Sequence, residues 1–219
     1  LKRASRLTED WTRRAFEYLD DHPPLYGHNQ TLFPIIQGGV DKEERLKCLE
    51  QMLPFAKCGL AIGGLSVGEK KDPMFEAVNI LGLHMPKDQP RYLMGVGKPT
   101  DIVKSILSGV DMFDCVLPTR NARNGQIFTH DGPINILNSK YKDDTSPIDL
   151  KSSVMFAQEH SKSYLRHLFK VNEMYGIRIA SLMNIAYYFD LINQIKIEIN
   201  NNSFVKWSED YLQKYEHKG

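Results

Sequence analysis

The chain has 219 residues, of which 28 are Lys or Arg and 27 are Asp or Glu, for a formal net charge of +1. This balance excludes a strongly basic nucleic-acid binder, so any contact with nucleic acid must come from a local patch. Hydrophobic residues make up 42% and charged residues 25%, which is typical of a globular protein and excludes a disordered one. No apolar run approaches the roughly 20 residues that a membrane helix needs.

Three features of the sequence bear on its compartment and completeness. Its three cysteines are Cys48, Cys58 and Cys115, too few and too scattered for a disulfide framework or a zinc cluster. Residues 1–14 lack the apolar core of a signal peptide, so a reducing cytoplasm is the simplest compartment. The chain begins at Leu1 with charged, helix-forming sequence, and we therefore expect it to be cut from a longer protein.

The first half of the chain alternates between strand-like and helix-like segments. After a first amphipathic helix, apolar runs that end in glycine or polar residues alternate with segments of helical period. Helices are predicted over residues 4–21, 41–57, 73–83 and 99–108, and strands over residues 32–36, 59–62, 91–94 and 111–116. This pattern favours parallel strands covered by helices, in either a doubly wound sheet or part of a (β/α)8 barrel. In both folds the chemistry lies at the carboxyl ends of the strands.

The second half has a different pattern. The Asp-Gly turn at residues 130–133 separates two short alternating runs, 126–129 and 134–137, and predicts a β-hairpin. Helices are then predicted over residues 158–175 and 180–201, separated by Gly176, with a short helix over residues 203–216.

Asp114 is the first candidate functional residue, because it ends a predicted buried strand. A carboxylate there is costly to desolvate unless it has partners or a chemical role. Arg120 and Arg123 follow within the run RNARNG, and arginine side chains match phosphate geometry. A structural aspartate and a solvated loop are the alternatives for these residues taken singly.

The glycine pairs at residues 38–39 and 63–64 end neighbouring predicted strands. Glycine allows backbone amides to approach a ligand closely, although tight turns after strands explain such pairs equally well. Gln37 precedes the first pair, and its amide could form two hydrogen bonds to a heterocycle. None of these features is specific alone.

Taken together, these motifs resemble the tRNA-guanine transglycosylases. The stretch PRYLMGVGKP, followed by GVDMFDCVLPTRNARNGQIFTHDG and NSKYKDDTSPID, is similar to the core signature of that family. The motifs IIQGG and GLAIGGLSVGE are two more at the expected spacing. The resemblance covers essentially the whole chain.

The resemblance implies a (β/α)8 barrel with an inserted subdomain, of which this chain would hold the second half. Residues 1–119 would form strand–helix units of the barrel, 120–183 the inserted subdomain, and 184–219 the closing helix and tail. It implies exchange of guanine at the first anticodon position of certain tRNAs for a 7-deazaguanine. Asp114 would be the nucleophile, forming a covalent ribosyl intermediate, and no redox cofactor or ATP would be needed.

The resemblance also implies roles for other residues. The base-binding set would be Gln37, Gly63, Gly64, Leu65, Val67, Glu69, Tyr92, Met94 and Gly95. The tRNA-binding set would be Arg120, Asn121 and Arg123. Valine at position 67 resembles bacterial members, whereas eukaryotic members carry glycine to admit queuine, so we expect the smaller base 7-aminomethyl-7-deazaguanine (preQ1).

Two departures from the family are visible. The family's zinc ligands, three cysteines and a histidine, align here with Ser152, Val154, Ala157 and Met183, none of which supplies a thiolate or imidazole. We therefore expect no zinc. The chain also holds only four of the eight barrel strands, and the general acid/base and the residue that reads the incoming base would precede Leu1.

The expected partners are the tRNAs for Tyr, His, Asn and Asp, which carry guanosine at the first anticodon position in a U-G-U context, together with guanine or preQ1. A homodimer is also expected, and a membrane is not. One alternative is a non-catalytic tRNA-binding or scaffold subunit that pairs with an active transglycosylase. Another is an unrelated phosphate-binding barrel enzyme, which the length of the signature disfavours.

Overall fold

The computed structural model of the chain describes residues 2–22 and 24–216. These residues divide into two compact units, of which the first comprises residues 2–22, 24–97 and 101–115 and the second residues 98–100 and 116–216. The first unit contains α1 (Lys2–Asp21), β1 (Ile35–Ile36), α2 (Lys42–Met52), the 3₁₀ helix η1 (Leu53–Phe55), β2 (Leu60–Ile62), α3 (Lys71–His84), β3 (Arg91–Leu93), α4 (Pro99–Leu107) from residue 101 onward, and β4 (Met112–Phe113). The second contains α5 (Leu117–Arg123), β5 (Gln126–Ile127), β6 (Ile134–Asn135), the 3₁₀ helix η2 (Ser139–Tyr141), α6 (Met155–Glu159), α7 (Lys162–Lys170), α8 (Met174–Asn200) and α9 (Phe204–Glu216).

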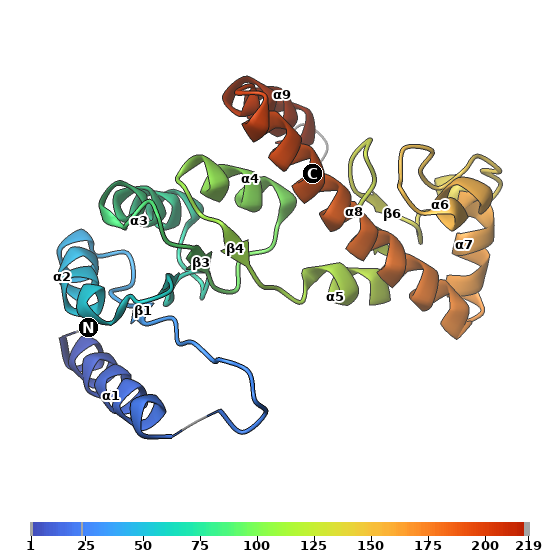
Figure 1. Ribbon diagram of the computed structural model, residues 1–219. Coiled ribbons are helices and arrows are strands. Elements are labelled where there is room, and N and C mark those ends of the chain that lie inside the picture. Colours follow the sequence, from blue (N-terminus) through green and yellow to red (C-terminus); the bar gives the residue numbers. More distant parts are fainter. Residues whose placement is uncertain (1, 23, 217–219) are drawn as a thin grey trace. The chain divides into compact units, whose positions relative to one another are not determined.

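The first unit is built on a parallel sheet with the strand order β1-β2-β3-β4. Ile35 pairs with Ala61, and Tyr92 pairs with Met112. Helices α2, α3 and α4 lie along one side of these strands (Figure 1). The predicted alternation of parallel strands and helices is confirmed, although each strand is shorter than the apolar run that predicted it. The carboxyl ends of all four strands meet at one edge of the sheet.

The core of this unit lies between the sheet and its helices. The strand residues Ile36, Ile62 and Leu93 are buried against the α3 residues Val78 and Leu81. Parallel strands covered by helices are apolar on both faces, which is why their sequence shows continuous runs rather than alternation.

The last strand of the sheet, β4, is shorter and more exposed than predicted. Residues 111–116 were expected to form a buried strand, yet only Met112 and Phe113 are in β4, and Met112 is 44% exposed. Among the described residues β4 pairs only with β3, so it is an edge strand there. Asp114 at its end is exposed, and a desolvation cost therefore does not mark it as functional here.

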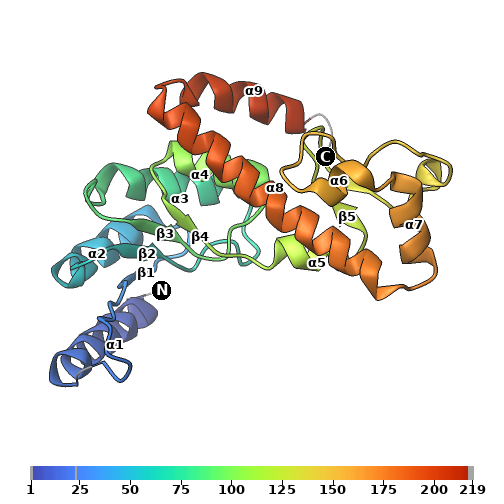
Figure 2. The ribbon, with the colours of Figure 1, turned by 45° about the vertical axis from the view of Figure 1, so that its right-hand side comes forward.

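The second unit is organised around the 27-residue helix α8. Figure 2 shows α5 alongside α8, and α9 turning back from its end. The predicted hairpin is confirmed, since β5 and β6 pair antiparallel with Gln126 opposite Asn135. Buried Asn184 of α8 accepts from Phe128 N at 2.8 Å and donates to the carbonyls of Pro118 and Gln126, both at 2.9 Å. One fully satisfied amide thus joins α8 to α5 and the hairpin.

Two helix boundaries differ from the predictions. The break between α7 and α8 falls at residues 171–173, where Asn172 has a φ of 55°, and Gly176 lies inside α8. A Cβ on Gly176 would lie 2.9 Å from Leu168 Cβ, so this glycine permits close packing of two helices and does not end one. Residues 120–123, for which no helix was predicted, belong to α5, whose first turn contains Pro118.

Candidate active site at the carboxyl ends of the parallel strands

A cavity of about 340 Å³ lies at the carboxyl edge of the sheet in the first unit. It is lined by Ile35, Gln37, Gly63, Gly64, Leu65, Ser66, Val67, Met94, Gly95 and Asp114. Eight of these are predicted site residues, and they come from loops that follow all four strands. The two other predicted base-site residues, Tyr92 and Glu69, contact residues of this cavity through hydrogen bonds.

Asp114 is held by one of its two carboxylate oxygens. Its Oδ1 accepts from the Tyr92 hydroxyl at 2.7 Å and from Gly95 N at 2.9 Å. Among residues 2–22 and 24–216, no hydrogen bond to Oδ2 is formed, so this oxygen is unbonded. The hydrogen bond to Asp114 raises the pKa of the Tyr92 phenol above its ordinary value, so Tyr92 remains a donor at neutral pH.

The side chain of Gln37 lies against two glycines. A Cβ on Gly64 would lie 2.5 Å from Gln37 Oε1, and one on Gly63 would lie 3.2 Å from Gln37 Nε2. Gly64 also has a φ of +64°, a conformation that favours glycine. These two glycines therefore provide the space that the Gln37 amide occupies beside the cavity.

Glu69 holds the loop of residues 66–67, which line part of the cavity. Its carboxylate accepts from the backbone amides of Ser66 and Val67, the latter at 3.0 Å. Partial burial opposes ionisation of Glu69, but these amide hydrogen bonds outweigh it and lower the pKa of the carboxyl below its ordinary value. Ser66 has a φ of 59°, so the anion holds a turn that few residues adopt unaided.

Sequence reasoning missed Arg45, a fully buried residue of α2 that is hydrogen-bonded to the loops that line the cavity. Its guanidinium donates to the carbonyls of Ile36, Gly39 and Gly64. Burial lowers its pKa to about 10, so it remains charged at neutral pH. The available signal was an arginine on the apolar face of α2, in helical register with buried Leu49 and Met52.

The predicted tRNA-binding residues Arg120, Asn121 and Arg123 belong to the second unit and lie on α5. Arg120 and Arg123 are three residues apart, which puts them on neighbouring positions of one helix face. Both are exposed. Within the part of the chain that the structure describes, neither forms an ion pair, so both guanidinium groups can meet phosphates.

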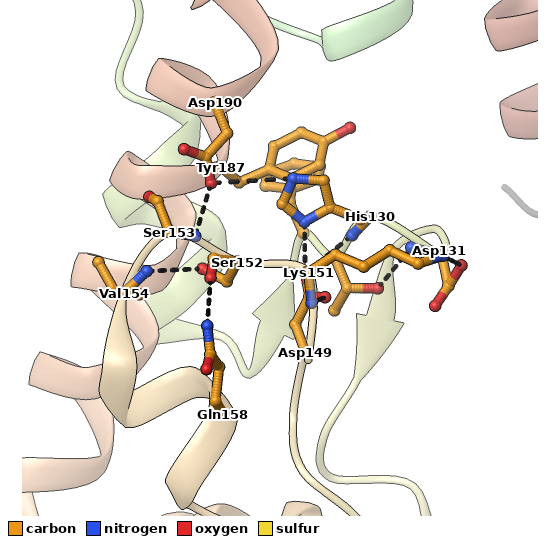
Figure 3. A network of polar contacts seen from close by, with 12 residues as sticks. His130, Asp131, Asp149, Lys151, Ser152, Ser153, Val154, Gln158, Tyr187 and Asp190 are labelled. Atoms are coloured by element: carbon orange, nitrogen blue, oxygen red, sulfur yellow. Dashed lines mark hydrogen bonds and ion pairs between the residues drawn. The ribbon is translucent and has the colours of Figure 1, made fainter. Parts of the chain in front are cut away.

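The four positions aligned with the family's zinc ligands lie in the second unit. Ala157 and Met183 are buried in its apolar core, and Val154 packs against that core. Ser152 Oγ accepts from Val154 N at 3.4 Å, and its carbonyl accepts from Gln158 Nε2 at 2.9 Å (Figure 3). A hydroxyl, two aliphatic side chains and a thioether do not form a zinc site, so these residues do not fit the metal.

A polar network holds the chain next to these positions. Asp149 Oδ2 accepts from His130 N at 2.9 Å and lies 2.8 Å from His130 Nδ1. Asp190 Oδ2 accepts from Ser153 N at 3.1 Å and lies 3.8 Å from His130 Nε2 (Figure 3). The network thus joins the hairpin turn and α8 to the segment 149–154.

This network predicts a pH dependence of stability. The hydrogen bond with Asp149 raises the pKa of His130. Burial and the charge of Lys151 act to lower this pKa, and the charge of Asp190 acts to raise it further. Burial of Asp149 is outweighed by its hydrogen bonds with His130 and Lys151 N, so the pKa of Asp149 is lowered. The His130 contribution is complete below the ordinary histidine value of 6.5 and is lost as pH rises through the folded-state value. The Asp149 contribution is complete above its ordinary value of 3.8 and is lost as pH falls through its folded-state value.

We therefore expect the unfolding free energy to decline by about 1 kcal/mol as pH rises from about 6 to about 9, and His130→Gln to abolish this decline. Chemical denaturation of both proteins at several pH values measures the effect. Lys151→Gln serves as the control: it removes an exposed ammonium that pairs with Asp131 and lowers the pKa of His130, so the decline should be kept. Parallel pH profiles for the wild type and His130→Gln would contradict the assignment.

The fold and site define an α/β protein whose carboxylate, amide and glycine loops meet at the carboxyl ends of parallel strands. Comparison with known proteins identifies the family more narrowly. The family described as "Queuine tRNA-ribosyltransferase" matches residues 1–217, and the chain belongs to this family.

Curated relatives of the chain carry the same name. A queuine tRNA-ribosyltransferase of Treponema denticola is 40% identical over 213 residues, which cover 97% of this chain and 56% of the relative. One from Francisella tularensis subsp. tularensis is 42% identical over 214 residues, which cover 98% of this chain and 57% of the relative. The chain therefore spans somewhat more than half the length of these relatives. Within residues 2–22 and 24–216, no helix combines the length and apolar character needed to cross a membrane.

Proposed function

We propose that this chain is the catalytic-site half of a tRNA-guanine transglycosylase, exchanging guanine at the first anticodon position for preQ1. The observation that carries the proposal is the arrangement of Asp114. One of its oxygens is held by Tyr92 and Gly95, and the other is unbonded among the described residues beside a cavity lined by Gln37 and Gly64. Family membership supports the same activity.

The reaction that this arrangement suits is a double displacement. Asp114 Oδ2 attacks the anomeric carbon of the ribose, the N-glycosidic bond breaks, and guanine leaves with the bonding electrons and is protonated. The incoming base then attacks the same carbon and displaces Asp114, with loss of its proton. Two inversions retain the configuration, as in retaining glycosidases. One glycosidic bond replaces another, so the exchange requires no oxidant and no ATP.

The cavity residues would bind the base through different contacts. The Gln37 amide and the backbone of Gly63, Gly64 and Leu65 would form hydrogen bonds to the heterocycle. Met94 would pack on its flat face, and Val67 would limit the space for substituents. Tyr92 and Gly95 orient Asp114, while Glu69 fixes the loop of residues 66–67. The target nucleotide must leave the anticodon stack to reach this cavity.

Arg120, Asn121 and Arg123 would bind the anticodon region of tRNA. Arginine supplies forked donors for phosphates and asparagine can read a base edge. The substrates would be the tRNAs for Tyr, His, Asn and Asp, with U-G-U around the target. We also propose a homodimer, as the family resemblance implies.

We propose that the first unit is the second half of a (β/α)8 barrel. Four parallel strands in sequential order, with α2, α3 and α4 along one side, support a barrel over a doubly wound sheet, which has helices on both faces. In this proposal, residues 1–119 are barrel units, 120–183 the insertion, and 184–219 the closing helix and tail.

We propose further that the insertion folds without zinc, its core being completed by Ala157, Met183 and Val154. Metal analysis of the purified chain should find far less than one zinc per chain, and EDTA should leave its melting temperature unchanged. A matched variant combining Ser152→Cys, Val154→Cys, Ala157→Cys and Met183→His should gain zinc binding. One tightly held zinc per wild-type chain, with unfolding on its removal, would refute this part.

Guanine exchange tests the proposed function. Labelled guanine should enter a tRNA with a U-G-U anticodon loop and should not enter the same tRNA with either flanking uridine replaced. The assay is run on the chain alone and with the N-terminal half of the Treponema denticola relative added. Absence of label in both arms would contradict the proposal.

A further inference from the structure

Arg45 forms a clamp between the two loops that carry the base-binding groups. It is 0% exposed, and its guanidinium donates to Gly39 O from Nε at 2.6 Å, to Ile36 O from Nη1 at 3.1 Å, and to Gly64 O from Nη2 at 3.3 Å. Burying a charge is costly unless it is well hydrogen-bonded. Its hydrogen-bond partners are three backbone carbonyls. The guanidinium therefore fixes the positions of these carbonyls, and the carbonyls fix the position of the guanidinium.

The first loop is held on both sides of Gln37. Ile36 immediately precedes Gln37 and its carbonyl accepts from Gly63 N at 3.0 Å as well as from Arg45. Gly39 follows two residues later, and Arg45 holds its carbonyl as well. A Cβ on Gly38, between them, would lie 2.8 Å from Arg45 N, so the loop lies directly on the start of α2. The amide of Gln37 therefore projects from a backbone with little freedom to shift.

The second loop is held at the peptide that joins Gly64 to Leu65. A trans peptide is planar, and its carbonyl and N–H point in opposite directions. Because the Gly64 carbonyl is directed at the buried guanidinium, the Leu65 N–H is directed away from it. Rotation of this peptide would leave Arg45 Nη2 without a partner in a dry interior, which is unfavourable.

A second buried arginine in the same unit provides a comparison. Arg91, at the start of β3, is 6% exposed and donates to the carbonyls of Met85 at 2.7 Å, Pro86 at 2.9 Å, Gly82 at 3.2 Å and Gly109 at 3.4 Å. It is at the amino end of its strand, and none of these residues lines the cavity. Both arginines are buried and donate to backbone carbonyls, but they do so at opposite ends of the strands of one sheet.

We propose that Arg45 is a positioning residue for base recognition: it sets the Gln37 amide and the Gly64–Leu65 peptide for one planar heterocycle. This inference rests on the proposed function for the identity of the ligand. It extends that function by assigning base affinity to a residue that does not touch the base. Glu69 holds the far part of the same loop, at Ser66 and Val67, so Arg45 and Glu69 would fix its two ends.

The test compares Arg45→Met, Arg45→Lys and Arg91→Met in the full chain. Guanine affinity is measured by calorimetry, and amide hydrogen exchange of residues 36–39 and 63–66 is measured without ligand. Arg45→Met should weaken guanine binding by about tenfold or more and speed exchange in both segments. Arg45→Lys should have an intermediate effect, because an ammonium lacks the planar fork. Arg91→Met should lower stability and leave guanine affinity unchanged.

The outcomes separate this inference from the proposed function. Unchanged guanine affinity in Arg45→Met, or an equal loss in Arg91→Met, would overturn the positioning role. If the wild type binds no guanine, the proposed function fails in this chain. Hydrogen exchange alone then decides whether Arg45 holds the two loops. Faster exchange at residues 36–39 and 63–66 in Arg45→Met but not in Arg91→Met supports the clamp, and equal exchange overturns it.

Discussion

Asp114→Asn should reduce guanine exchange by about ten-thousandfold or more. An amide is too weak a nucleophile to form the ribosyl intermediate, and loss of a covalent nucleophile has effects of this order in other enzymes. The substitution keeps Oδ1 as an acceptor for Tyr92 and Gly95, so the fold and tRNA binding should be preserved. Labelled guanine incorporation and tRNA affinity, measured on the same preparation, check both expectations.

Asp111→Asn is the matched control for this substitution. Asp111 lies at the other end of the same strand, where its Oδ2 accepts from Arg91 N at 2.9 Å, a bond that asparagine can also accept. Exchange should be retained in Asp111→Asn. Full exchange in Asp114→Asn would exclude Asp114 as the nucleophile, whereas tRNA binding without exchange in every protein would favour the scaffold alternative.

Val67→Gly should allow the chain to use queuine, which carries a bulky cyclopentenediol, in addition to preQ1. Val67 lines the cavity on the loop held by Glu69, and removing its side chain widens that side. A steric contact of this size changes discrimination by about 10- to 200-fold. The ratio of queuine to preQ1 incorporation into one tRNA measures the shift.

Val40→Gly is the control for the effect of glycine alone. Val40 is exposed and follows the Gly38–Gly39 turn, but it does not line the cavity. Its substitution should leave the incorporation ratio unchanged. Failure of Val67→Gly to gain any use of queuine would show that position 67 does not set the size of the accepted base.

The sequence was enough to predict that the site residues lie close together, because this follows from the parallel arrangement of the strands. Parallel strands have their carboxyl ends at one edge, so Gln37, Gly63, Met94 and Asp114 could be brought together from strand ends alone. The roles assigned to these residues came from the family resemblance. Their mutual geometry, such as the Tyr92–Asp114 hydrogen bond, required the structure.

The features that sequence reasoning missed depend on contacts distant in sequence. Arg45 and Asn184 are polar residues on buried helix faces, where periodicity predicts apolar ones, and their carbonyl partners come from other segments. Gly176 was interpreted as a helix break because intrinsic propensity disfavours glycine in helices. Its packing against Leu168 overrides that preference. The exposure of β4 depends on which strands lie beside it in the sheet. The sequence of β4 itself does not specify its neighbours.

Covalent trapping decides whether Asp114 forms the ribosyl intermediate. The chain, with and without the N-terminal half of the Treponema denticola relative, is incubated with a U-G-U tRNA, quenched by denaturation and digested. Mass spectrometry then locates any ribosyl adduct. We expect an adduct on the peptide that carries Asp114, and this adduct should disappear when excess guanine is added before the quench. Guanine exchange without an adduct, or an adduct on any other residue, would contradict this expectation.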